Sequence, residues 1–163
     1  MEITRKIIYL IMILPLLLSG CNQEDDIYEI FTSDTWHWNA TYTTTNWEDD
    51  NNAKLHINLN SEKVYDINKD PNIYIIKFEN DGNFSAKGNS ISFTGNWGAN
   101  PKDHSVSITN IKLQGNAAGL DKMFYDGIRT ATFYRGSSLL LKLFNSAKNE
   151  FIQFHPQSKV KEQ

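Results

Sequence analysis

The sequence predicts a mainly β fold: a small antiparallel barrel, or a strongly bent sheet, of about eight strands with one short α-helix. Residues 35–43 alternate between apolar and polar side chains, and this period of two is typical of a half-buried strand. Several short apolar runs follow, separated by turn signals rich in Asn, Asp and Gly. Apolar residues recur at helical spacing in residues 120–129. These patterns predict many short strands and a single helix in one domain.

The first predicted strand, residues 35–43, has a strongly aromatic face. We expect one side of this strand to pack into the core, the side that carries Trp36, Trp38, Ala40 and Tyr42. His37 falls on the opposite side, where we expect an ordinary surface histidine. A polar loop over residues 44–52 leads to a second, weaker strand, predicted from the alternation of residues 55–59.

The rest of the chain continues the pattern of short strands. Further strands are predicted over residues 73–78, 84–87, 91–97, 106–113, 130–135, 138–144 and 151–155. The segment Asn80-Asp81-Gly82-Asn83 is a strong turn signal, Gly136 is a second predicted turn, and the alternation of one run slips at Asn110. The predicted helix places Leu120, Phe124 and Ile128 on one side.

The N-terminus has the layout of a secretory signal peptide. Arg5 and Lys6 precede an apolar run of twelve residues, 7–18. As a helix this run would span roughly 18 Å, which is too short for a bilayer core of about 30 Å. Pro15 also argues against an uninterrupted buried helix. We therefore predict that residues 1–20 are a leader rather than a transmembrane helix.

The segment Leu18-Ser19-Gly20-Cys21 resembles the lipobox of bacterial lipoproteins. The resemblance implies that Cys21, the single cysteine of the chain, becomes the acylated N-terminus after cleavage and anchors the protein to a membrane. The alternative is an ordinary signal peptide with a chance cysteine. The predicted organisation is a signal peptide over 1–20, a lipidated cysteine and acidic tether over 21–32, one β-rich domain over 33–156 and a polar tail over 157–163.

The acidic segment Glu24-Asp25-Asp26 follows the cysteine directly. It resembles the tract that marks surface export in lipoproteins of the Bacteroidetes. This resemblance implies an outer-membrane protein, lipid-anchored and exposed at the cell surface. The alternative is a plain charged linker, which would leave the domain facing the periplasm.

The C-terminal half resembles the META domain, a small β-rich family of bacterial proteins. The resemblance is carried by Phe93-Thr94-Gly95-Asn96-Trp97, Met123-Phe124, the segment 132–136, Leu139-Leu140-Leu141 and the closing run Phe151-Ile152-Gln153-Phe154. Trp36 would correspond to the tryptophan of that family's opening strand. The chain is similar to the same degree to lipocalin-like lipoproteins of the Bacteroidetes. Both resemblances imply a small β-domain, and neither implies a catalytic residue or a cofactor.

The sequence offers no pattern of residues that is typical of catalysis or metal binding. The four histidines, at positions 37, 56, 104 and 155, are scattered and have no zinc-type spacing. Glu48-Asp49-Asp50 is read as a solvated loop, with cation binding as the alternative. Removing residues 1–20, with Glu2, Arg5 and Lys6, changes the net charge from −3 to −4, which gives no electrostatic footprint for nucleic acid. We predict no enzyme, no cofactor and no nucleic-acid partner.

Trp47 is the one aromatic residue that the sequence leaves without a packing partner. It lies in the polar loop beside Asn46 and Glu48, where no periodic face includes it. We therefore name it as a possible contact for a glycan or a partner protein. The expected function is a membrane-anchored, non-catalytic envelope lipoprotein that interacts with a partner or maintains the envelope. The alternatives are a carbohydrate- or small-ligand-binding module and an enzyme with an unrecognised site.

Overall fold

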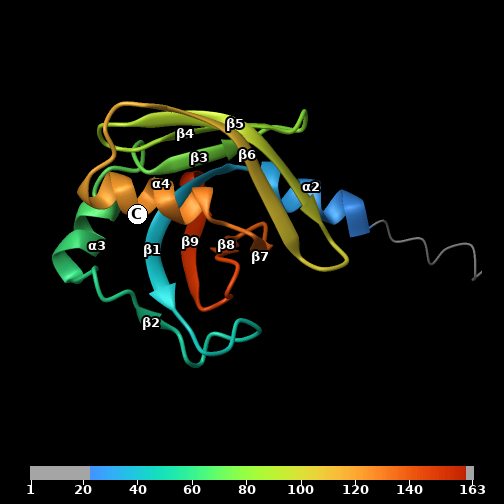
Figure 1. The fold of residues 1–163 in the computed structure, drawn as a ribbon, viewed down its shortest axis with the longest axis horizontal. Coiled ribbons are helices and arrows are strands. Elements are labelled where there is room, and N and C mark those ends of the chain that lie inside the picture. Colours follow the sequence, from blue (N-terminus) through green and yellow to red (C-terminus); the bar gives the residue numbers. More distant parts are fainter. Residues whose placement is uncertain (1–22, 161–163) are drawn as a thin grey trace, which may run out of the picture.

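Nine antiparallel strands form one strongly curved sheet in the described part of the chain, residues 23–160 of a computed structural model (Figure 1). The strands are β1 Thr35–Thr43, β2 Lys54–Leu55, β3 Ile75–Phe78, β4 Asn83–Lys87, β5 Ser92–Asn100, β6 Ser105–Gln114, β7 Phe133–Ser137, β8 Leu140–Phe144 and β9 Glu150–Pro156. The helices are α2 Gln23–Thr32, α3 Ser61–Asn68, α4 Gly119–Arg129 and α5 Gln157–Val160. The predicted mainly β class is confirmed.

The sheet closes on itself, because β1 pairs with β3 on one side and with β9 on the other. The strands from β3 to β9 follow one another as an antiparallel meander, and β2 is a two-residue addition to the end of β1. The seam between β6 and β7 is narrow, with Ser105 opposite Phe133 as its single pair. Closure of this kind removes most of the unpaired strand edges that an open sheet would expose, and those that remain include the edges of β6 and β7 beyond this pair.

Strand β1 contains a β-bulge that changes which residues face the interior. Trp36 and Trp38 are fully buried, as predicted, but the register with β9 shifts between Trp38 and Ala40. After this shift Thr41 is buried opposite Ile152, whereas Tyr42 stacks on Phe151 at 5.3 Å between ring centroids. Ala40 is buried in the core as predicted, whereas Tyr42 is only partly buried, because one extra residue after Trp38 reverses the alternation and turns Thr41 inward in its place.

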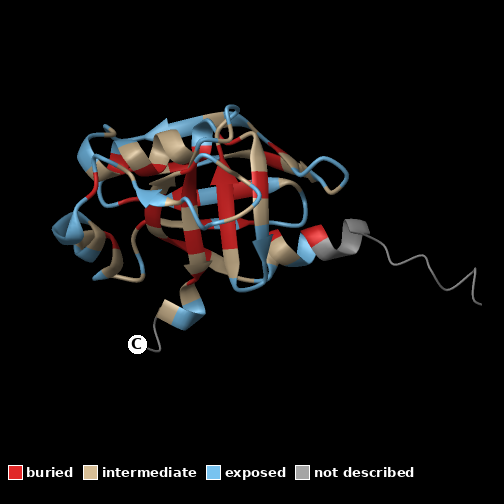
Figure 2. Ribbon diagram, turned by 90° about the horizontal axis from the view of Figure 1, so that it is seen from below, coloured by how far each residue is buried: buried red, intermediate tan, exposed pale blue. Residues whose placement is uncertain are grey.

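Two helices close the ends of the barrel. Phe31 of α2 is fully buried and packs against Phe78, at the end of β3, with ring centroids 5.0 Å apart. Phe124 of α4 is also fully buried and packs against Tyr74, just before the start of β3, at 5.6 Å. The two helices therefore lie at opposite ends of β3, and Figure 1 shows both positions. The interior between them is filled, and buried residues line the inner side of the strands in Figure 2.

Helix α2 corrects the predicted tether. Residues 21–32 were expected to form a charged, extended linker, but residues 23–32 are helical. Ile27 and Phe31 of this helix lie in the core, with 5% and 0% of their surface exposed. The domain therefore begins before residue 33, and the chain has more than the single helix predicted. Cys21 lies outside the described residues.

The weak strand predicted over residues 55–59 is wrong beyond Leu55, and the chain instead turns into helix α3 at Ser61, which the sequence pattern does not predict. Strand pairing ends at Leu55, Ile57 is 91% exposed, and the Asn60 side chain accepts a hydrogen bond from the Lys63 amide as the N-cap of α3. Ile67 of α3 is fully buried. The Asn68 side chain donates to the carbonyl of Asn39, so α3 also satisfies the bulge in β1.

Three smaller predictions have clear outcomes. The turn at residues 80–83 is confirmed, with Gly82 at φ +80°, and Asn110 adopts φ +53° where the alternation was expected to slip. Gly136 is not a turn residue: it lies within β7, where an added Cβ would be 2.6 Å from the carbonyl oxygen of Leu140. The predicted polar tail begins as the short helix α5, whose Gln157 side chain donates to the carbonyl of Pro71.

Candidate functional site

The loop between β1 and β2 folds back over the outer face of β7, β8 and β9, and Trp47 anchors it there. The Trp47 ring lies 5.8 Å from the ring of Phe144 and 6.0 Å from that of Phe133, and it is half-buried. The Lys148 ammonium lies over the same ring at 3.8 Å and over Phe133 at 4.0 Å. We call Trp47, Phe133, Phe144 and Lys148 the outer cluster. Trp47 therefore has packing partners, contrary to the expectation, and its contact with a glycan or partner stays a prediction.

The same loop brings Asp50 to two cationic side chains. Arg135 of β7 and Lys142 of β8 are directly opposite each other in the antiparallel register. One carboxylate oxygen of Asp50 lies 3.5 Å from Arg135 Nη2, and the other accepts a hydrogen bond from Lys142 Nζ. Arg135 also donates through Nη1 to the carbonyl of Trp47. We call Arg135 and Lys142 the basic pair; Asp50 is not simply a solvated loop residue.

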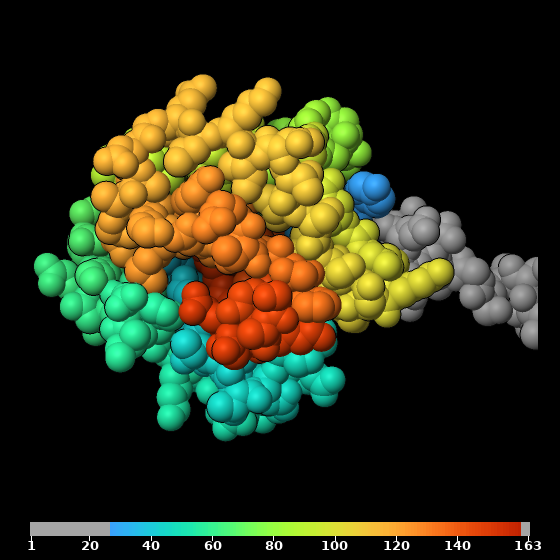
Figure 3. Space-filling view, in the orientation of Figure 1, coloured from blue at the N-terminus to red at the C-terminus, as the bar shows by residue number. Residues whose placement is uncertain are grey.

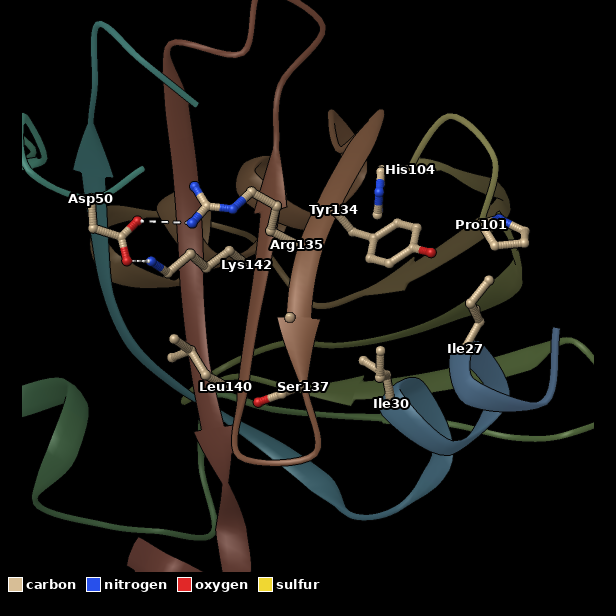
Figure 4. Close-up of a pocket in the computed structure, with 11 residues that line it drawn as sticks. Ile27, Ile30, Asp50, Pro101, His104, Tyr134, Arg135, Ser137, Leu140 and Lys142 are labelled. Carbon is tan, nitrogen blue, oxygen red and sulfur yellow. Dashed lines mark hydrogen bonds and ion pairs between the residues drawn. The ribbon is translucent and has the colours of Figure 1, made fainter. Parts of the chain in front are cut away.

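The basic pair lines one end of a surface pocket of about 490 Å³, which we call the α2 pocket (Figure 4). Its apolar wall comes from α2, from the loop after β5 and from the start of β8; it comprises Ile27, Ile30, Pro101 and Leu140. In Figure 4, Tyr134 and His104 lie between the basic pair and the residues Ile27, Ile30 and Pro101, whereas Leu140 lies beside Lys142. Burial raises the pKa of the Tyr134 phenol, so Tyr134 is a neutral hydrogen-bonding group at neutral pH. The pocket is therefore apolar at one end and cationic at the other.

A second pocket of about 490 Å³ lies between α4 and the segment that leads from β2 to α3. Figure 3 shows this face hollowed between the orange α4 and the green and cyan segments around α3 and β2. His56 Nε2 lies 3.4 Å from a carboxylate oxygen of Glu150 in this pocket. Thr41 Oγ1 is buried there and makes no hydrogen bond with the described residues. The polar groups of this pocket are mostly paired with one another.

Two of the four histidines, His37 and His155, lie side by side in the sheet. His37 is fully buried beside Ile67 and Asp70, so the prediction of a surface histidine is wrong because α3 covers that side of β1. His37 and His155 are paired across β1 and β9, and burial lowers the pKa of both imidazoles. Both imidazoles are therefore held in the neutral form more strongly than a solvated histidine.

Asp121 is a buried carboxylate whose role is structural. It lies in the first turn of α4, and its two oxygens accept hydrogen bonds from the backbone amides of Asn89 and Ser90 at 2.7 and 2.9 Å. An added Cβ on Gly88 would lie 2.3 Å from one of these oxygens, so the carboxylate also needs the glycine beside it. Among the residues that the structure describes, no group of three His, Cys, Asp or Glu side chains is placed to hold a metal ion.

Sequence reasoning missed the basic pair, although one signal was present. Lys142 interrupts the apolar run Leu139-Leu140-Leu141-Lys142-Leu143-Phe144, and a lysine inside such a run is unusual for a core strand. Asp50 was considered only as part of an acidic loop. No spacing in the sequence connects position 50 with positions 135 and 142, because tertiary folding of the loop alone brings them together.

Comparisons with known proteins identify the family. The domain of unknown function DUF4847 matches residues 22–156. A similar crystal structure is that of a DUF4847 family protein from Bacteroides vulgatus, with 28% sequence identity and a TM-score of 0.65. The match covers 79% of this chain and 96% of that one, so the crystallised relative consists almost wholly of the matched domain. No curated protein matches the chain.

The family match includes residues of α2, in agreement with the packing of that helix into the core. The resemblance to the META domain and to lipocalin-like lipoproteins rests on the strand pattern alone. In the described residues no helix has the length and apolar character needed to cross a membrane. The family shown by the comparisons is a different one: this chain belongs to the DUF4847 family.

Proposed function

We propose that this protein is a non-catalytic, lipid-anchored protein of the cell envelope whose β-domain acts by binding at its surface. The observation that carries the binding role is the α2 pocket, which combines an apolar wall with converging charged groups. Such a combination is typical of small-molecule sites. The filled barrel interior supports a site on the outside rather than inside the barrel.

The anchor in this proposal is supported by the sequence Leu18-Ser19-Gly20-Cys21 after a short apolar run. The acidic tract that follows supports display on the outer membrane, with the periplasmic face as the alternative. A domain held at the outer membrane would meet small amphiphiles, glycans and other envelope proteins. The non-catalytic part of the proposal is supported by Asp121, whose buried carboxylate accepts two backbone hydrogen bonds and so has a structural role.

Metabolic labelling with a fatty-acid probe tests the anchor. We expect the wild-type chain to be labelled in cells and the Cys21→Ser chain to be unlabelled, because the acylated sulfur is removed. Ser19→Ala is the matched control, since it keeps a small residue within the same segment and should remain labelled. Labelling that persists in Cys21→Ser would contradict the anchor. Proteolysis of intact cells that express the wild-type chain then separates surface display from a periplasmic orientation.

A further inference from the structure

We propose that the α2 pocket binds a single-tailed carboxylate amphiphile, with the ligand carboxylate on the basic pair and its apolar tail along α2. This inference names the ligand class of the binding role proposed above and rests on that role. The pocket volume of about 490 Å³ lies within the range of small-molecule sites.

The basic pair carries two positive charges, and its counter-ion in the protein, Asp50, neutralises only one of them. Arg135 and Lys142 are directly opposite across β7 and β8, and like charges in this position destabilise a sheet unless an anion lies between them. Asp50 supplies one negative charge for these two positive charges. A ligand with a single negative charge would therefore neutralise the charged end of the pocket.

The basic pair also has hydrogen-bond donors to spare. The Lys142 ammonium has three N–H donors, and Asp50 is its one hydrogen-bond acceptor in the described chain. The Arg135 guanidinium has five N–H donors; one bonds the Trp47 carbonyl, and Nη2 approaches Asp50 at 3.5 Å. The Lys142 ammonium also lies over the Phe151 ring, 5.0 Å from its centroid, and Lys142 is only 3% exposed, so few water molecules reach its remaining donors. Burying a charge in this way is costly unless it is paired and hydrogen-bonded.

Asp50 itself indicates the head group that the basic pair accepts, because it already presents a carboxylate to both side chains. Asp50 belongs to a surface loop and its side chain is 51% exposed, so the carboxylate is open to solvent on its outer side. A second carboxylate entering from solvent would share the basic pair with Asp50. Leu140 lies beside Lys142, and Ile27, Ile30 and Pro101 lie on the far side of the pocket, where the tail would extend.

Calorimetric titration of octanoate into residues 22–163, the matched domain with its C-terminal tail, tests this inference. The crystallised relative shows that a chain of almost this extent folds. We expect one octanoate to bind per chain. Lys142→Met should weaken binding by about tenfold or more, because a hydrogen bond to a charged group is lost. Asp50→Asn should strengthen binding, because the competing carboxylate is removed. Lys87→Gln, which removes an exposed lysine from β4, is the control and should leave affinity unchanged.

Lys142→Met is expected to weaken octanoate binding and Asp50→Asn to strengthen it. These opposite effects distinguish a ligand site from a purely structural ion pair. Met keeps the length of the lysine side chain, and Asp50 is half-exposed, so both variants should melt cooperatively. Weaker octanoate binding in Asp50→Asn would overturn the carboxylate inference. Octyl glucoside binding as tightly as octanoate would also overturn it, while leaving the binding role intact. An absence of binding by both probes would overturn the inference and the proposed binding role together.

Discussion

Asp121 is the residue whose contribution to stability the structure defines most sharply. Its carboxylate accepts two backbone hydrogen bonds from the turn between β4 and β5 and joins that turn to α4. Asp121→Ala would leave the amides of Asn89 and Ser90 without these acceptors, which we expect to lower the free energy of unfolding by about 1–3 kcal/mol. Urea unfolding measures this change.

Asp126 provides the matched control on the same helix. Its carboxylate pairs with Lys122 and Arg129 near the surface, and its side chain is 33% exposed. Exposed ion pairs of this kind contribute about 0–1 kcal/mol, so Asp126→Ala should have the smaller effect. An equal loss of stability in both variants would show that Asp121 acts only through the helix and not through the turn.

The burial of His37 predicts that the stability of the protein depends on pH. Burial lowers the pKa of His37 below its ordinary value of 6.5, so the folded state holds this imidazole neutral where the unfolded chain binds a proton. Stability should therefore be complete above about pH 6.5 and decrease as the pH falls from there toward the lowered folded-state pKa. Burial lowers the pKa of His155 in the same direction, so both residues contribute.

Urea unfolding of His37→Gln at several pH values measures how much His37 contributes to the pH dependence of stability. We expect the decrease in stability below about pH 6.5 to become shallower in this variant, because one proton-binding group is removed from the unfolded state. The double variant with His155→Gln should be shallower still. A wild-type pH dependence retained in His37→Gln would contradict the burial of this imidazole.

At the scale of elements, α2 is part of the folded domain rather than a linker. Phe31 is fully buried and contacts three aromatic rings, those of Phe78, Trp97 and Tyr134. Phe31→Ala should therefore lower the free energy of unfolding by about 3–5 kcal/mol, through lost burial and the cavity that remains. Tyr28→Ala, on the same helix but 52% exposed, should have a much smaller effect. Equal melting temperatures for Phe31→Ala and the wild type would contradict the claim that α2 is part of the folded domain.

Physical reasons explain why the sequence predicts some elements and misses others. The strands around the predicted turn at 80–83 and the helix around Phe124 were found, because their apolar period is regular and their boundaries carry turn residues. The strand over residues 55–59 is wrong because the alternation of Leu55, Ile57 and Leu59 imitates a strand, although Ile57 is exposed. Helix α3, which follows at Ser61–Asn68, was missed because Val64 and Ile67 alone give it only a weak helical period. Its one local signal was Asn60 before Ser61, a helix N-cap without a strong apolar face behind it.

The candidate site was less predictable than the fold. Trp47 stands out in the sequence because no periodic face includes it, but its partners Phe133 and Phe144 lie on strands far along the chain. The bulge after Trp38 was also invisible in the sequence, because a single extra residue leaves the alternation of residue types intact. Long-range contacts that depend on one loop conformation, as for Asp50, have no local pattern from which to predict them.

At the scale of the whole molecule, the arrangement separates stability from recognition. Two helices close a barrel whose interior is filled by aromatic side chains, so the fold does not depend on a ligand inside it. The unneutralised charge and the apolar wall of the α2 pocket meet outside the filled interior, beside α2. Because α2 begins two residues after Cys21, the proposed anchor would hold this pocket close to the membrane surface, where single-tailed amphiphiles concentrate.

The most direct test of this account is a map of the octanoate contact by two-dimensional NMR of the ¹⁵N-labelled domain. We predict that the backbone amides of Asp50, Arg135 and Lys142, together with those of α2, shift on titration. The indole N–H of Trp38, inside the barrel, should not shift, because the filled interior admits no ligand. Shifts centred on Trp38, with none at the basic pair, would contradict the claim that this protein binds its ligand at the outer surface beside α2.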